Sequence, residues 1–126
     1  MNLTSLKSMK KSGKKITILT CYDASFARLL ESIEVDAILV GDSLGIFIKG
    51  EANTHDVSLS DMIYHTKSVS RGAQSSFIIS DLPIHTYETN DLAYKSALAL
   101  IEAGAHMVKL EGGASLSSIV THLKTK

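Results

Sequence analysis

The chain is poor in residue types that define whole classes of protein. Of its 126 residues, one is cysteine, one is proline and none is tryptophan. The single cysteine, Cys21, excludes a disulfide framework within the chain and a cysteine-based zinc cluster, so a reducing cytoplasm fits best. No low-complexity tract, linker or short repeat interrupts the sequence, and we therefore expect one domain over residues 1–126.

The chain also lacks an excess of charge and a long hydrophobic run. Thirteen Lys and Arg residues oppose thirteen Asp and Glu residues, so no overall field attracts nucleic acid or anionic lipid. No apolar run reaches the roughly 18 residues that a membrane helix needs. We expect neither nucleic acid nor a membrane as a partner. The basic, acid-free N-terminal segment leaves organellar targeting open as an alternative to a solvated helix.

What is present is a repeated alternation of apolar runs and helical patterns. Apolar runs predict strands at residues 15–21, 37–41, 76–80 and 106–110, and helical patterns follow at 25–33, 58–70, 90–103 and from about 115. Nearly continuous apolar strands in βα order are typical of a parallel sheet covered by helices. The predicted fold class is α/β, either a doubly wound sheet or part of a (βα)8 barrel.

Two predicted helices carry specific expectations about packing. The pattern over 25–33 places four apolar side chains on one helical face: Phe26, Leu29, Leu30 and Ile33. At the start of the next helix, Ser58 and Asp61 resemble a capping box. The inner side of that helix is predicted to carry Met62, Ile63, Thr66 and Val69.

A polar side chain follows each predicted strand, at the edge where ligands bind in α/β folds. These residues are Asp23, Asp42 with Ser43, Asp81, and Glu111. Alternation along the strands places Asp42 on the face of Val40, Asp81 on the face of Ile79, and Glu111 on the face of Lys109. If those faces all line a barrel lumen, three carboxylates and one ammonium converge there.

Converging carboxylates repel one another and raise each other's pKa unless a cation compensates. Oxygen ligands without cysteine or clustered histidine favour Mg²⁺ over zinc. The ordinary alternative is that each Asp caps the helix that follows it. Lys109 is harder to explain in this way, because it interrupts a strand that otherwise looks buried. His65 and Cys21 are expected to be packing residues, and His85 lies nearer the predicted site.

Six segments together resemble one enzyme family, the ketopantoate hydroxymethyltransferases. In order, they are KITILTCYD (15–23), FARLLE (26–31), VDAILVGDSLG (35–45), MIYHTKSVSRGA (62–73), SDLP (80–83) and AGAHMVKLEGG (103–113). The resemblance covers nearly the whole chain. Two departures stand out: Cys21, where alanine is frequent, and the NTHD stretch at 53–56, where a Thr-Leu-Pro-like stretch is more usual.

The resemblance implies a (βα)8 TIM barrel that transfers a hydroxymethyl group from its co-substrate 5,10-methylenetetrahydrofolate to 3-methyl-2-oxobutanoate, giving 2-dehydropantoate for pantothenate biosynthesis. It implies Mg²⁺ held by Asp42, Asp81 and Glu111, directly or through water. It further implies that Ser43 and Lys109 contact the keto acid, with Asp42 and Asp81 lining the same pocket.

A complete barrel needs about 250 residues, whereas this sequence carries about four βα units, an N-terminal half-barrel. By resemblance, the general base lies beyond Lys126, so no residue here is assigned that role and we expect little activity from the chain alone. Its two unpaired strand edges predict association into a homo-oligomer. Two alternatives stay open: a related Mg²⁺-dependent keto-acid lyase or mutase barrel, and a non-catalytic half-barrel fragment.

Overall fold

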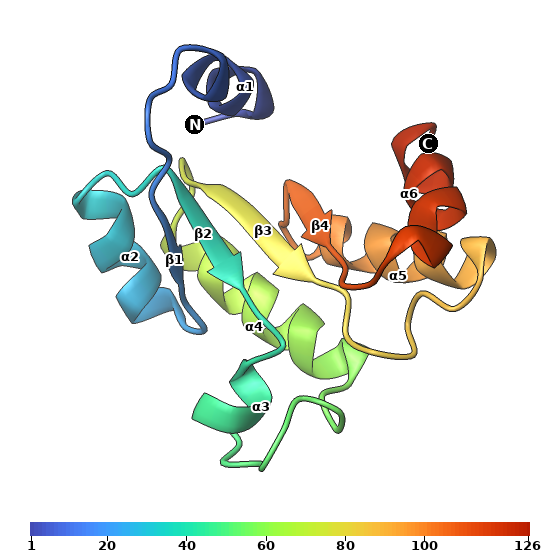
Figure 1. Ribbon diagram of the computed structural model, residues 1–126. Coiled ribbons are helices and arrows are strands. Elements are labelled where there is room, and N and C mark those ends of the chain that lie inside the picture. The colour runs from blue at the N-terminus through green and yellow to red at the C-terminus, as the bar shows by residue number, and fades with distance from the viewer.

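A single parallel sheet organises the computed structural model, which describes residues 1–126 (Figure 1). Its strands lie in the order β1-β2-β3-β4. Their bounds are Ile18–Thr20 for β1, Ala37–Val40 for β2, Phe77–Asp81 for β3 and Met107–Lys109 for β4. Sequential order without a reversal is the arrangement of successive units in a (βα)8 barrel, whereas a doubly wound sheet reverses at a switch point. The prediction of a half-barrel is confirmed.

Helices connect the strands and cover one face of the sheet. The predicted helices form as α2 (Ala24–Ser32), α4 (Leu59–Gly72), α5 (Asn90–Glu102) and α6 (Ser117–Lys124). The chain also forms α1 (Leu3–Lys11), α3 (Leu44–Phe47) and the short 3-10 helix η1 (Ala114–Leu116). The capping box is confirmed, because Ser58 and Asp61 exchange side-chain to backbone hydrogen bonds. No helix has both the length and the apolar character required to cross a bilayer.

The core has two parts, one on each face of the sheet. Between the sheet and its helices lies a cluster that includes Ile38, Val40, Ile78, Met62 and Leu100. On the opposite face, α1 covers the N-terminal end of the sheet (Figure 1) and buries Leu6 and Met9 against three sheet residues, namely Ala37, Phe77 and Ile79. This second face corresponds to the lumen of a barrel, and α1 closes its floor.

The sheet register corrects the predicted route by which Asp42 reaches the site. Ala37 pairs with Phe77 and Leu39 with Ile79, so Val40 belongs to the helix-covered face and not to the face of Ile79 and Asp81. Alternation along β2 would therefore place Asp42 on the helix-covered face, away from Asp81. The strand ends at Val40, and the turn that follows redirects the backbone toward Asp81.

The predicted apolar face of α2 is also only partly correct. Leu30 is buried and so is Ala27, whereas Phe26, Leu29 and Ile33 are 48%, 51% and 60% exposed. Helix α2 lies beside the edge strand β1 (Figure 1), and its main helix contact is with α4. Ala24 lies against Gly72 of α4, so the side of α2 that carries small residues such as Ala27 faces inward. The side that carries Phe26, Leu29 and Ile33 stays largely exposed.

Candidate active site

A cavity of about 240 Å³ opens at the carboxyl ends of β2, β3 and β4. Its lining contains four of the five residues that the sequence predicts for the site, which are Asp42, Asp81, Lys109 and Glu111. The remaining lining residues are Thr54, His55, Ile84 and Tyr87. The predicted convergence of strand-end charges is therefore observed, at the edge of the sheet that binds ligands in barrels of this type.

Asp81 is the buried centre of this arrangement, since only 5% of its side chain is exposed. Its Oδ2 accepts a hydrogen bond from the backbone N–H of Asp42 at 3.2 Å. Its Oδ1 lies 3.0 Å from Nζ of Lys109, but apart from this ion-pair contact that oxygen is buried without a hydrogen-bond partner. One carboxylate oxygen at the bottom of the cavity thus keeps unused acceptor capacity.

The protonation equilibria of the pair follow from burial and from mutual attraction. Burial raises the pKa of the Asp81 carboxyl, and it outweighs the opposing effects of the Lys109 ammonium and the Asp42 N–H. For Lys109, burial lowers the pKa, but the bonds and charges of Asp81 and Glu111 prevail and raise it. Lys109 is therefore a permanent positive charge at the edge of the cavity.

Glu111 lies farther out, with 79% of its side chain exposed. Its Oε1 accepts a bond from Nζ of Lys109 at 3.1 Å, and its backbone carbonyl accepts one from the hydroxyl of Tyr87 at 3.0 Å. Tyr87 thus ties the segment after β4 to the segment after β3. Lys109 lies between the two carboxylates, forming an ion pair with Asp81 and both an ion pair and a hydrogen bond with Glu111.

The ligand atoms of the site are of the type that a hard divalent cation prefers, but the side chains that carry them are far apart. Asp42, Asp81 and Glu111 offer only oxygen, the ligand that Mg²⁺ prefers, and Oδ1 of Asp81 is buried with capacity to spare. No group of three His, Cys, Asp or Glu side chains lies close enough together to hold a metal directly. The residues therefore suit a cation that retains part of its water, as Mg²⁺ does in proteins.

Two other predicted strand-end residues lie outside the cavity lining. Asp23 caps α2 and accepts hydrogen bonds from the backbone N–H groups of Ser25 and Phe26. For this residue, the alternative of helix capping is therefore correct. Ser43 follows Asp42, and its Oγ lies 2.8 Å from the hydroxyl of Tyr22. A Cβ atom at Gly41 would lie 2.8 Å from this Oγ and 3.5 Å from Oδ2 of Asp81, so Ser43 and Asp81 flank the same point of the backbone.

Sequence reasoning missed the part of the lining that comes from loops. Thr54 and His55 belong to the segment between α3 and α4, and Ile84 and Tyr87 to the segment between β3 and α5. None of these four residues directly follows a predicted strand. For Thr54 and His55, the unusual stretch at 53–56 was the one feature of the sequence that pointed to them. His85 was considered nearer the site, but its side chain is 72% exposed and pairs with Glu88.

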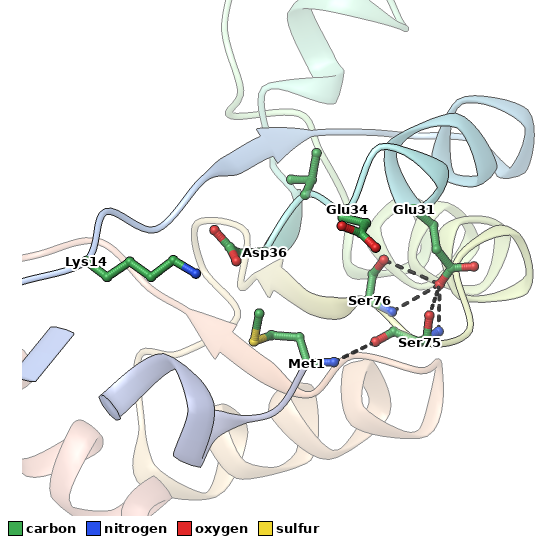
Figure 2. Close-up of a pocket in the computed structure, with 8 residues that line it drawn as sticks. Met1, Lys14, Glu31, Glu34, Asp36, Ser75 and Ser76 are labelled. Carbon is green, nitrogen blue, oxygen red and sulfur yellow. Dashed lines mark hydrogen bonds between the residues drawn. The ribbon is translucent and has the colours of Figure 1, made fainter. Parts of the chain in front are cut away.

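A second, larger cavity of about 400 Å³ lies at the opposite end of the sheet (Figure 2). Figure 2 shows Glu31 pointing toward Ser75 and Ser76, whose N–H and hydroxyl groups donate to its Oε1. The ammonium of Met1 donates to the carbonyl of Ser75 at 2.9 Å. These bonds fasten α1 and α2 to the turn before β3, which is a structural role.

The fold is that of known barrel enzymes. The chain is similar to the crystal structure of 2,3-dimethylmalate lyase, a member of the PEP mutase/isocitrate lyase superfamily, with a TM-score of 0.73 at 18% identity over 97% of this chain and 46% of that chain. Phosphoenolpyruvate phosphomutase from Streptomyces platensis subsp. rosaceus gives 0.70 at 14% identity, covering 87% of this chain and 38% of that one. The fold and the edge that holds the charged cavity define an α/β half-barrel.

The sequence comparisons narrow the class to a family. The family model described as ketopantoate hydroxymethyltransferase matches residues 1–126. The 3-methyl-2-oxobutanoate hydroxymethyltransferase of Nitrosococcus oceani is 52% identical over 100% of this chain and 48% of its own length, and that of Thiobacillus denitrificans is 47% identical with the same coverage. The chain belongs to the ketopantoate hydroxymethyltransferase family. It spans about half the length of these curated relatives.

Proposed function

We propose that this chain contributes the metal- and keto-acid-binding half of an enzyme that transfers a hydroxymethyl group from 5,10-methylenetetrahydrofolate to 3-methyl-2-oxobutanoate, giving 2-dehydropantoate. The observation that carries the proposal is the buried Asp81 at the end of β3, whose Oδ1 keeps free acceptor capacity beside Lys109 in a cavity of about 240 Å³. Membership of the family supports the substrate pair.

In this proposal Asp42, Asp81 and Glu111 would hold Mg²⁺, directly or through water. The bound cation would supply Lewis-acid polarisation of the keto oxygen, which favours loss of the neighbouring C3 proton. Lys109 keeps its proton and places positive charge beside the carboxylate or enolate oxygen of the substrate. Ile84 and Tyr87 contribute to the wall of the cavity beside these charges. We assign no residue of this chain to abstract the C3 proton.

A related Mg²⁺-dependent keto-acid lyase or mutase is the second candidate. Its support is the fold likeness, which includes a phosphonopyruvate hydrolase solved with oxalate and Mg²⁺, at a TM-score of 0.68 and 16% identity. An identity of 52% to a hydroxymethyltransferase against 18% to a lyase favours the transferase. Competition between 3-methyl-2-oxobutanoate and 2,3-dimethylmalate for the chain separates the two, because only a lyase site is expected to prefer the hydroxy diacid.

The test is isothermal calorimetry of the chain with Mg²⁺ and then with 3-methyl-2-oxobutanoate in the presence of Mg²⁺. Asp42→Asn and Asp81→Asn are expected to weaken Mg²⁺ binding by about 10-fold or more, since even residues that only support metal ligands change affinity by about 10–100-fold. Glu102→Gln is the matched control, a carboxylate to amide change at an exposed position of α5. Unchanged Mg²⁺ affinity in both aspartate variants would overturn the proposal.

A further inference from the structure

We propose that Tyr22 is a positioning residue of the site, which holds the hydroxyl of Ser43 so that this hydroxyl donates its hydrogen to the carboxylate of the keto acid. The inference rests on the proposed function, together with the contact between Ser43 and the keto acid that the family resemblance implies. It adds a residue from the end of β1 to a site otherwise built from the ends of β2, β3 and β4 and from two loops.

The relevant contact joins two half-buried side chains from neighbouring strand ends. The Tyr22 hydroxyl lies 2.8 Å from Oγ of Ser43, the usual distance for a hydrogen bond between two hydroxyl groups. Ser43 has no other side-chain hydrogen bond. Its orientation is therefore set by Tyr22, because a serine hydroxyl otherwise rotates to suit whatever partner is available.

The direction of this hydrogen bond follows from acidity. A phenol, with an ordinary pKa of about 10, is a much better donor than an aliphatic alcohol, while the alcohol oxygen is the better acceptor. Tyr22 therefore donates and Ser43 accepts. This leaves the hydrogen of Ser43 free, and a hydroxyl that accepts one hydrogen bond becomes a stronger donor in the next.

The free hydrogen of Ser43 is close to the charged cavity. Its Oγ and Oδ2 of Asp81 lie on the same side of Gly41, where a Cβ atom would approach them to 2.8 Å and 3.5 Å. A carboxylate of Asp81 cannot donate, and Lys109 has two carboxylate partners for its three N–H groups. An anionic ligand in this cavity therefore gains from a second donor beside Lys109, and Ser43 is near enough to Asp81 to be one.

Tyr22 is itself held firmly by the central helix α4. Nδ1 of His65 lies 2.7 Å from the backbone carbonyl of Tyr22, and because a carbonyl only accepts, this nitrogen carries the hydrogen. The rings of Tyr22 and His65 meet edge to face, with centroids 6.2 Å apart and planes at 82°. The phenol is therefore fixed before any ligand arrives, which is what a positioning role requires.

The test is a double-mutant cycle on keto-acid affinity, measured by calorimetry on this chain at saturating Mg²⁺. Tyr22→Phe removes the hydroxyl and keeps the ring; we expect about 5-fold weaker binding of 3-methyl-2-oxobutanoate, as befits one hydrogen bond. Ser43→Ala is expected to weaken binding by at least as much. The double variant should bind like Ser43→Ala, because Tyr22 acts through Ser43. Tyr64→Phe, another tyrosine whose ring contacts His65, is the control and should bind normally.

Urea unfolding of the same variants reports any change in stability, while the affinity cycle tests positioning. If Tyr22 acted only on folding, Tyr22→Phe would weaken keto-acid binding by the same factor with Ser43 or with alanine at position 43. Additive losses of affinity would therefore overturn the inference. Weaker binding in Ser43→Ala together with normal binding in Tyr22→Phe would overturn it and leave the proposed function standing. Normal binding in Ser43→Ala would also overturn the inference alone. A wild-type chain that binds no keto acid would contradict the proposed function, and the inference would fall with it.

Discussion

The ammonium of Lys109 lies 3.0 Å from Oδ1 of Asp81, although the two residues belong to adjacent strands and are 28 positions apart in the sequence. The sheet register pairs their Cα atoms directly, so the ion pair is a cross-strand neighbour pair on the lumen face. Asp81 is nearly inaccessible, whereas the side chain of Lys109 is 38% exposed. The pair thus presents its positive end to the cavity mouth and keeps its negative end at the bottom.

Asp81→Asn is expected to leave the chain at least as stable as the wild type. Burial raises the pKa of Asp81 in the folded state. The folded state therefore binds a proton at this group more tightly than the unfolded state, and the ionised carboxylate lowers the free energy of unfolding at neutral pH. An amide of the same shape removes that cost, while Lys109 keeps Glu111 as a partner.

Urea unfolding at neutral pH measures this effect, with Glu102→Gln as the reference for a carboxylate far from the cavity. Stability that is retained while Mg²⁺ affinity falls would mark Asp81 as a functional group that opposes stability. A loss of more than about 1 kcal/mol, the size of an ordinary destabilising substitution, would mean that attraction to Lys109 exceeds the cost of burial.

Gly72→Ala is expected to destabilise the chain by about 1–3 kcal/mol, the usual range for overpacking. A Cβ atom at Gly72 would lie 2.3 Å from the carbonyl oxygen of Ala24, so α2 would have to move away from α4. Helix propensity alone predicts the opposite, a gain of about 1 kcal/mol for alanine over glycine inside a helix. The sign of the change therefore decides between local preference and helix packing.

Thermal or urea unfolding checks this prediction, and Gly113→Ala is the control. Gly113 has open space around its Cβ position and a negative φ of -99, so alanine fits there without strain. A stabilised Gly72→Ala variant would show that the contact between α2 and α4 is looser than the structure has it.

The capping box of α4 is expected to make stability depend on pH in the acid range. The backbone N–H of Ser58, its hydroxyl and Lys49 lower the pKa of Asp61 in the folded state. A lowered carboxyl pKa contributes stability above the unfolded value of about 4, and that contribution is lost as the pH falls through the folded value. Unfolding midpoints should therefore fall between neutral pH and acid pH, and Asp61→Asn should flatten part of this fall.

Urea midpoints of the wild type and of Asp61→Asn, taken at several pH values, are the measurement. Asp56→Asn serves as the control, because Asp56 is exposed on the neighbouring loop and its side chain makes no hydrogen bond or ion pair. Parallel pH curves for the wild type and Asp61→Asn would refute the prediction.

The chain is expected to self-associate through the β1 side of the half-barrel. Two residues of the edge strand, Ile18 and Leu19, are 48% and 47% exposed, and α2 has three more exposed apolar side chains in Phe26, Leu29 and Ile33. An unpaired strand next to a large apolar surface favours association. Sedimentation analysis should show species larger than a monomer, and Leu29→Lys should reduce them.

Tyr64→Lys is the control for this prediction, since it also replaces a large exposed side chain by a charge, but on the central helix α4. It should leave association unchanged. A monodisperse monomer for the wild type, with a cooperative thermal transition, would contradict the expectation and indicate that the sheet is complete by itself.

Local patterns were sufficient to predict most elements. The capping box at Ser58 and Asp61 and the inner face of α4 formed as predicted, because both depend on residues three or four positions apart. The helix predicted over 90–103 forms as Asn90–Glu102 with Thr89 as its N-cap, so its end differs by one residue, as is typical of helix ends. The predicted first strand, residues 15–21, shortens to Ile18–Thr20 because an edge strand has a single partner to define it.

The sequence by itself determined the βα order, the charged strand ends and the family, since these depend on residue type and spacing along the chain. Only the tertiary structure decided which faces meet. Asp42 reaches Asp81 through a turn that breaks the alternation, Tyr22 reaches Ser43 across neighbouring strand ends, and Leu29 stays exposed although it lies on the apolar side of α2. Contacts of this kind depend on register and on the docking of distant segments, which no local pattern encodes.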